Sequence, residues 1–210
     1  MAHFPSAALA VLLCAGSARA APPAVTIDSL LAQFRALPGL SAHFREEKRL
    51  ALLSVPLFSE GTVHFAPPGR LARHTTAPSA STLLIDGDRL SFGDGAQSET
   101  IPLDANPVVR LFVDGFMKLL EGDKAALLRI FTIDLRPHAK GWELRLLPKV
   151  APMTEVLRSI VIHGKGVVLS KMTIAETTGD ETVTTFDRVD VDRRYSPAEI
   201  ARLFALPRGR

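Results

Sequence analysis

NPVVRLFVDGFMKLLE, residues 106–121, is the stretch on which the fold depends. Asn106 followed by Pro107 is typical of a helix N-cap and the first helical position, so the stretch predicts a helix. Its strongly polar side chains form one narrow stripe, namely Arg110, Asp114, Lys118 and Glu121. A surface helix commonly has an apolar stripe about a third of its circumference wide, whereas this helix is apolar over most of it. The helix must therefore be covered on two sides or face a ligand cavity.

On both sides of this helix the chain has short runs of period-two hydrophobicity separated by turn residues. The predicted strands are 43–53, 57–66, 70–76, 81–86 and 89–93, and then 130–137, 141–147, 157–163, 166–176 and 181–191. Asp86-Gly87-Asp88 and Gly93-Asp94-Gly95 predict hairpin turns. An antiparallel sheet of about 10–11 strands normally curls, and helices inserted midway are placed to close its mouth. The expected fold class is α+β, an open antiparallel β half-barrel with a helical lid over an apolar cavity.

Three shorter helices complete the predicted order of elements. The first covers residues 27–37, with Thr26 or Asp28 as its N-cap, and ends at Pro38-Gly39. Asp123 predicts the start of a second short helix directly after the apolar one. The residues from Ser196 to Glu199 form a capping box with proline at the first helical position, which predicts a short helix near the C-terminus.

Residues 1–20 have the pattern of a secretory signal peptide, an apolar run followed by Ala18-Arg19-Ala20. We expect cleavage after Ala20 and export of residues 21–210 to the periplasm as a single domain. Cys14 is the only cysteine, and Leu13 before it argues against lipidation of this residue. The mature chain then contains no thiol, which excludes disulfides and thiolate metal sites.

Charge and motif content exclude several classes of function. The formal net charge is only +3, and basic residues are interspersed with acidic ones, as in residues 45–49. A nucleic-acid-binding surface usually has a basic stripe, so we expect no nucleic-acid partner. The sequence has no His-Glu-x-x-His and no Gly-x-Ser-x-Gly motif, and Glu46 and Glu47 are adjacent in a predicted strand, so they point to opposite faces. We therefore expect no catalytic residue, no metal and no other cofactor, and a protein that is not an enzyme.

The patterning also predicts which apolar residues face the cavity. On the lid helix these are Leu111, Phe112, Phe116, Met117 and Leu120, and on the strands they are Phe65, Leu71, Leu83, Ile85 and Leu144. Arg73 shares strand parity with Leu71, so it lies on the concave face if Leu71 does. An inward charge needs an anion, and the candidates are Asp114, Glu121 or an acidic head group on the ligand. Alternatively, a bend in the strand leaves Arg73 solvated on the outside.

Several short motifs follow one another in the order and spacing of a known family. They are Leu40-Ser41-Ala42-His43-Phe44-Arg45, Gly61-x-Val63-x-Phe65, Pro68-Gly69-Arg70-Leu71 with Pro78 ten residues on, Leu84-Ile85-Asp86-Gly87-Asp88-Arg89-Leu90, Trp142-Glu143-Leu144-Arg145-Leu146-x-Pro148 and Phe204-Ala205-Leu206-Pro207. In these motifs the chain resembles the LolA-type outer-membrane lipoprotein carriers of Gram-negative bacteria. The resemblance implies an open β-barrel with a helical lid over a hydrophobic cavity, which holds lipoprotein acyl chains during periplasmic transit without nucleotide or metal. It also implies a monomer that meets membrane-bound donor and acceptor proteins.

The chain departs from this family at Pro67, where the family usually has a basic residue that is linked to lid closure. A contact between Arg73 and Asp114, at the mouth of the cavity, would replace it. The expected function is that of a periplasmic carrier, which binds the acyl chains of a lipoprotein or lipid for transfer towards the outer membrane. The alternative is a non-carrying periplasmic interaction module in which the apolar helix is a permanent part of the core.

Overall fold

The computed structural model describes residues 25–207. Its strands are β1 (Leu40–Arg49), β2 (Leu57–Ala66), β3 (Arg70–Ala77), β4 (Ser81–Asp86), β5 (Arg89–Gly93), β6 (Ser98–Pro102), β7 (Phe131–His138), β8 (Gly141–Pro148), β9 (Leu157–Lys165), β10 (Val168–Glu176) and β11 (Glu181–Asp190). Its helices are α1 (Ile27–Arg35), the 3-10 helix η1 (Leu103–Ala105), α2 (Pro107–Leu120), α3 (Lys124–Ile130), α4 (Met153–Val156) and α5 (Pro197–Leu203). The predicted signal peptide lies outside the described residues.

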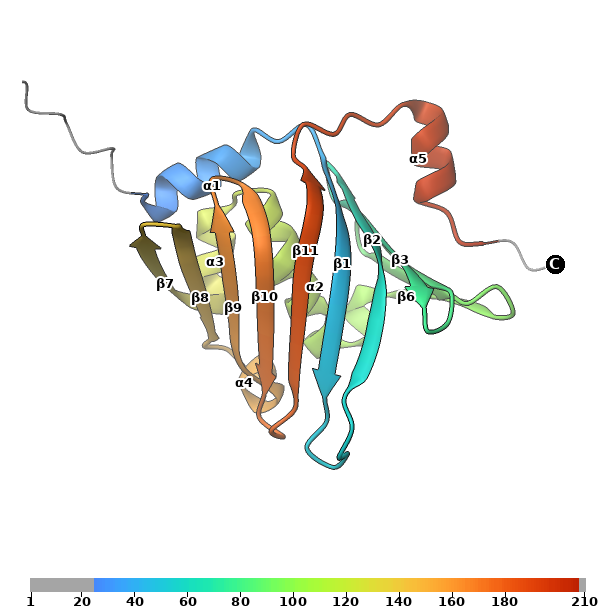
Figure 1. Ribbon diagram of the computed structural model, residues 1–210, viewed down its shortest axis with the longest axis horizontal. Helices are drawn as coiled ribbons and strands as arrows, with labels where there is room; N and C mark the ends of the chain where they lie inside the picture. The colour runs from blue at the N-terminus through green and yellow to red at the C-terminus, as the bar shows by residue number, and fades with distance from the viewer. Residues whose placement is uncertain (1–24, 208–210) are drawn as a thin grey trace, which may run out of the picture.

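All eleven strands form one antiparallel sheet in the order β6-β5-β4-β3-β2-β1-β11-β10-β9-β8-β7 (Figure 1). In its middle β1 pairs with β11, with Phe44 opposite Phe186, so the strands before the apolar helix join those after it. β6 and β7 stand at the two ends of the order and do not pair with each other, so the sheet stays open. The predicted α+β half-barrel is thereby confirmed.

Some element boundaries differ from those predicted. The pattern does not predict β6, because Ser98, Glu99 and Thr100 are all exposed and the strand has no alternation to recognise. β1 covers residues 40–49 instead of 43–53, because the apolar residues after Arg49 belong to an exposed turn. The four-residue α4 is too short to have a periodic pattern of its own.

Local capping signals start the helices where the sequence predicts. The Asn106 side chain accepts a hydrogen bond from the Val109 backbone N–H at 3.2 Å, and proline follows at the first position of α2. Asp123 caps α3, and the predicted capping box starts α5. Of the two candidates at the start of α1, Thr26 is the N-cap, and Asp28 lies in the first turn. These helix ends are settled by contacts within three residues, which explains why the sequence alone locates them.

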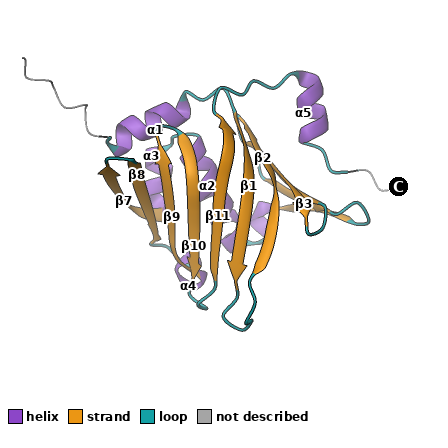
Figure 2. Cartoon of the chain, viewed as in Figure 1, coloured by secondary structure: helices purple, strands orange, loops and turns teal. Residues whose placement is uncertain are grey.

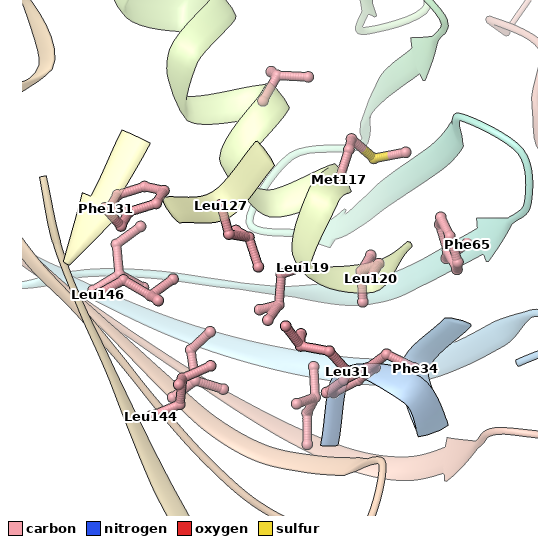
Figure 3. Close-up of a cluster of buried hydrophobic side chains, with 14 of the residues drawn as sticks. Leu31, Phe34, Phe65, Met117, Leu119, Leu120, Leu127, Phe131, Leu144 and Leu146 are labelled. Atoms are coloured by element: carbon pink, nitrogen blue, oxygen red, sulfur yellow. The ribbon is translucent and has the colours of Figure 1, made fainter. Parts of the chain in front are cut away.

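The core lies between the sheet and helices α1, α2 and α3. Figure 2 shows α2 and α3 behind the sheet with α1 across one end. Leu31, Leu119 and Leu144 belong to one buried cluster that spans these layers (Figure 3). Gly115 brings α2 close to β7, since a Cβ at this position would lie 2.5 Å from the Phe131 ring. The absence of a side chain at Gly115 therefore lets α2 pack closely against the start of β7.

The C-terminal segment packs against β2 and β3. The Tyr195 hydroxyl donates a hydrogen bond to the Leu40 carbonyl at 2.7 Å and lies 3.1 Å from Nδ1 of His64. Nε2 of His74 lies 2.8 Å from the Leu203 carbonyl oxygen. His64 lies between Val63 and Phe65 in β2, so strand alternation places it on the convex face. Desolvation under this segment lowers the pKa of His64 from 6.5 to about 4.

Candidate functional site

An apolar cavity of about 270 Å³ lies between α2 and the concave face of the sheet. Its lining residues are Phe44, Glu46, Val63, Leu71, Arg73, Leu83, Ile85, Leu90, Val109, Phe112, Val113, Phe116, Met172, Ile174, Thr184 and Phe186. The register explains how the strands supply them. Leu71 pairs with Ile85 and Arg73 with Leu83, and residues directly opposite in an antiparallel pair point to the same face.

Two further spaces adjoin this cavity. A small void of about 20 Å³ shares Val63, Leu71, Phe116 and Phe186 with it. A groove of about 360 Å³ shares Val109, Phe112 and Ile174, and is also lined by Lys48 and by residues of α4. The shared side chains place both spaces next to the cavity on the inner side of the sheet, with the groove on the side of Lys48 and α4.

The structure brings together half of the apolar residues predicted for the cavity. Leu71, Leu83, Ile85, Phe112 and Phe116 all line it. Phe65 and Leu120 lie beside it and line the small void. Whether any of these residues contacts a ligand remains a prediction.

Three predicted cavity residues lie elsewhere. Leu111 and Met117 line a different groove, of about 470 Å³, on the side of α2 that faces α3. Leu144 is completely buried in the core and lines none of these spaces. A helix that is apolar nearly all round has no single inward face in its sequence, and α2 uses one side for the cavity and another for α3.

The sequence reasoning missed the floor of the cavity. Phe44 of β1, Met172 and Ile174 of β10, and Phe186 of β11 form it. Period-two alternation in the sequence shows only which residues share a face within each strand. Only the pairing of β1 with β11 shows that these faces meet the residues of β3 and β4.

A polar network borders this apolar lining. Nη2 of Arg73 donates to Oε1 of Glu46 at 2.9 Å and to Oγ of Ser59 at 3.3 Å. The Thr184 hydroxyl donates to Oε2 of Glu46 at 3.1 Å. The guanidinium of Arg73 also lies 4.3 Å from the centre of the Phe44 ring. The Arg73 and Glu46 side chains are 31% and 21% exposed, so the ion pair is only partly screened by solvent.

Arg73 thus points inward, as its parity predicts, and the solvated alternative is wrong. Its partner within the protein is Glu46 and neither of the two predicted carboxylates, whereas a contact with an acidic head group of the ligand remains a prediction. Asp114 pairs with Arg110 at 3.4 Å, and Glu121 pairs with Lys118 at 2.6 Å. The hydrogen bond from Lys118 to Glu121 is the main reason that the pKa of Lys118 is raised. The acidic partner of Arg73 comes from β1, two strands away from β3, and this proximity is a property of the curved sheet.

An ion pair between Arg110 and Asp88 connects α2 to the sheet. Nη2 of Arg110 lies 3.1 Å from Oδ1 of Asp88, in the turn between β4 and β5. The Leu103 backbone N–H also donates to the Asp88 carbonyl at 2.9 Å. The segment that leads into α2 is therefore held against this hairpin.

The fold and the cavity define a class of protein. An open half-barrel with an apolar cavity under a helix is a binding scaffold. Within residues 25–207 no three His, Cys, Asp or Glu side chains gather in a way that could hold a metal ion. In the same range, no helix combines the length and the apolar composition needed to cross a membrane.

The sequence matches the family of outer membrane lipoprotein carrier proteins described as LolA-like over residues 19–192, and the chain belongs to this family. The resemblance inferred from the sequence motifs is therefore confirmed. The family's description is that of carrier proteins. None of the curated proteins with which the sequence was compared matches it.

Several solved structures are similar to this one. A LolA superfamily protein from Nitrosomonas europaea has 10% sequence identity and a TM-score of 0.43, and the match covers 84% of this chain and 97% of the other. An outer membrane lipoprotein-sorting protein domain from Vibrio parahaemolyticus has 10% identity and a TM-score of 0.43, with 83% and 96% covered. MucB, in its complex with MucA from Pseudomonas aeruginosa, has 11% identity and a TM-score of 0.47, with 83% and 58% covered.

Proposed function

We propose that this protein is a periplasmic carrier that holds the acyl chains of a lipoprotein or lipid between α2 and the sheet for transfer towards the outer membrane. The composition of the cavity is the observation that supports this proposal most strongly. Apart from Glu46, Arg73 and Thr184, every residue that lines it is apolar. A hydrocarbon chain can bury its surface there without leaving a protein hydrogen-bonding group unsatisfied.

The dimensions of the site also support an elongated apolar ligand. The cavity of about 270 Å³ is slightly below the usual range for small-molecule sites, which begins at about 300 Å³. The adjoining groove extends it along the sheet. Each buried methylene contributes about 0.8 kcal/mol, so a long chain supplies a large gross driving force, offset by the ordering of the ligand and the displacement of the lid.

This function requires export by the predicted signal peptide, and membrane-bound donor and acceptor proteins at the two ends of the route. The protein acts as a monomer, uses no cofactor and catalyses no reaction. The family's description as lipoprotein carriers supports the carrier role itself.

Uptake of a fluorescent fatty-acid analogue by purified protein tests the proposal. The Phe116→Glu substitution places a carboxylate in the wall that the cavity shares with the small void. We expect it to weaken uptake at least tenfold, because the charge loses its hydration when a chain enters. Leu128→Glu is the matched control, since Leu128 is also a helical apolar residue but is exposed, and it should leave uptake unchanged.

Circular dichroism distinguishes a carrier from an interaction module in which α2 is permanent core. A carrier predicts that Phe116→Glu stays folded while it loses uptake. A core role predicts no uptake by the wild type and unfolding of the variant. Native mass spectrometry of protein from the periplasm, followed by solvent extraction, should recover a lipid, and consistent absence of lipid would contradict the proposal.

A further inference from the structure

The turn between β1 and β2 is unusually apolar. Residues 50–58 read LALLSVPLF and contain no charged side chain. Five of them are exposed large hydrophobic residues, namely Leu52 (97%), Val55 (70%), Phe58 (61%), Leu53 (52%) and Leu57 (52%). Among residues 25–207 these are the most exposed large apolar side chains, and the next is Phe92 at 48%. Such a concentration on one hairpin costs solubility and points to a binding surface.

This tip projects from the molecule and is apolar all round. Figure 1 shows the β1–β2 turn extending beyond the other turns at the same end of the sheet. Leu57 lies opposite Lys48 and Phe58 opposite Glu47, so the two apolar side chains point to opposite faces of the sheet. A protein partner would cover one face of such a hairpin. An apolar medium that surrounds the tip covers both.

The tip is also held in place. The Ala51 backbone N–H donates to Oδ1 of Asp180, in the neighbouring turn between β10 and β11, at 2.8 Å. The Leu53 N–H donates to the Leu50 carbonyl at 2.9 Å. Because these contacts already order the backbone, little further conformational entropy is lost when the exposed side chains bind.

Basic side chains lie directly behind the apolar tip. Lys48 and Arg49 end β1, and Arg45 lies four residues before Arg49, on the same face of the strand. Each of the three pairs with a carboxylate, Arg49 with Glu47, Lys48 with Glu176 and Arg45 with Asp187, but their side chains remain 66%, 40% and 62% exposed. Long basic side chains can reach phosphate groups while their aliphatic stems stay in apolar surroundings. Apolar residues ahead of basic ones are the arrangement of proteins that bind at a membrane surface.

We propose that residues 50–58 insert into the head-group region of a phospholipid bilayer. The tip also lies next to the proposed binding site. Lys48, at the base of the tip, also lines the groove that shares Val109 and Phe112 with the cavity. A molecule docked in this way has its apolar groove next to the membrane. None of residues 50–58 lines the cavity, so this docking surface is separate from the proposed carrier site.

Flotation with vesicles of phosphatidylethanolamine and phosphatidylglycerol tests the proposal on the full mature chain. The variant is Leu52→Ser/Leu53→Ser/Val55→Ser. The matched control is Phe92→Ser/Leu147→Ser/Val168→Ser, which removes three exposed apolar side chains from other strands. We expect the wild type and the control to float, and the tip variant to lose at least tenfold in vesicle partitioning. Thermal unfolding should show that all three proteins are folded at the temperature of the assay. The control should lose more stability than the tip variant, because its altered side chains are only 38–48% exposed.

A Leu53→Trp substitution gives a second, direct measurement. Trp142 is the only native tryptophan and is completely buried, so its fluorescence should not respond to vesicles. The added tryptophan should shift to shorter wavelength on vesicle binding. Unchanged emission, or equal flotation of the wild type and the tip variant, would overturn the proposal. It would also be overturned if the tip crosslinked to a membrane protein but bound no protein-free vesicles.

Uptake of the fatty-acid analogue separates this proposal from the carrier function. The tip variant should take up the analogue in solution like the wild type, because none of its three substitutions lines the cavity. Phe116→Glu should lose uptake but float normally, because this substitution alters the cavity and not the tip. Failure of flotation with normal uptake refutes the membrane surface alone.

Discussion

Replacing Arg73 with methionine removes the cation that faces Glu46 while leaving a side chain of similar length. The loss of a hydrogen bond between charged groups costs about 1.5–3 kcal/mol. Loss of the contact with the Phe44 ring, 4.3 Å from the guanidinium, adds about 0.5–1 kcal/mol. Both charged side chains are partly exposed, so solvent compensates some of this. We expect Arg73→Met to lower the free energy of unfolding by about 2 kcal/mol.

Urea unfolding of a double-mutant cycle measures this effect. With an m-value of about 2 kcal/mol/M, the midpoint for Arg73→Met should fall by about 1 M without a change in slope. Glu46→Gln should recover part of the loss when combined with Arg73→Met, because the neutral amide no longer needs a cation. We expect a coupling free energy of about 1–2 kcal/mol between the two positions.

Asp114 provides the control for this cycle, because it is the partner predicted from the sequence but pairs instead with Arg110. Arg73→Met and Asp114→Asn should be additive to within about 0.5 kcal/mol. The reasoning would be refuted if Arg73 and Glu46 proved additive, or if Arg73 coupled to Asp114 more strongly than to Glu46. Ligand release should be measured on the same variants, since a contact with the ligand's head group would appear there and not in the cycle.

Three other perturbations test the packing, the outer face and the lid. Gly115→Ala should destabilise the protein by about 1–3 kcal/mol in urea unfolding, despite the better helix propensity of alanine, because the new Cβ would lie 2.5 Å from the Phe131 ring. The folded-state pKa of His64 is about 4, below its ordinary value of 6.5, so between these values the unfolded chain binds more protons. The contribution of His64 to the free energy of unfolding should therefore be constant above pH 6.5 and fall by up to about 2 kcal/mol towards pH 4. Thermal unfolding across this range should show a smaller decrease for His64→Asn than for the wild type. Asp88→Ala removes the exposed ion pair that connects α2 to the β4–β5 turn, so stopped-flow release of the fatty-acid analogue should accelerate by up to about fivefold, whereas an unchanged rate would show that this contact does not restrain the lid.

The sequence predicts most of the secondary structure and part of the cavity. Residues of strands that follow one another in the chain, such as Leu71 and Ile85, were assigned together correctly because hairpin pairing is local. The floor of the cavity could not be assigned in this way. Phe44 and Phe186 are far apart in the sequence, and their contact depends on a pairing that closes a loop of more than a hundred residues.

Local chemistry determined where the helices begin and which strand residues share a face, including that Arg73 shares the face of Leu71. Those features depend on residues a few positions apart, and hydrogen bonding and alternation act at that range. Only the tertiary structure decided that Phe112 and Phe116 face the cavity while Leu111 and Met117 face the α3 side. It also decided that Glu46, and not Asp114, is the partner of Arg73. The physical reason is that a helix apolar on almost every side can be rotated to several positions with similar burial, and an ion pair across three strands depends on the curvature of the whole sheet.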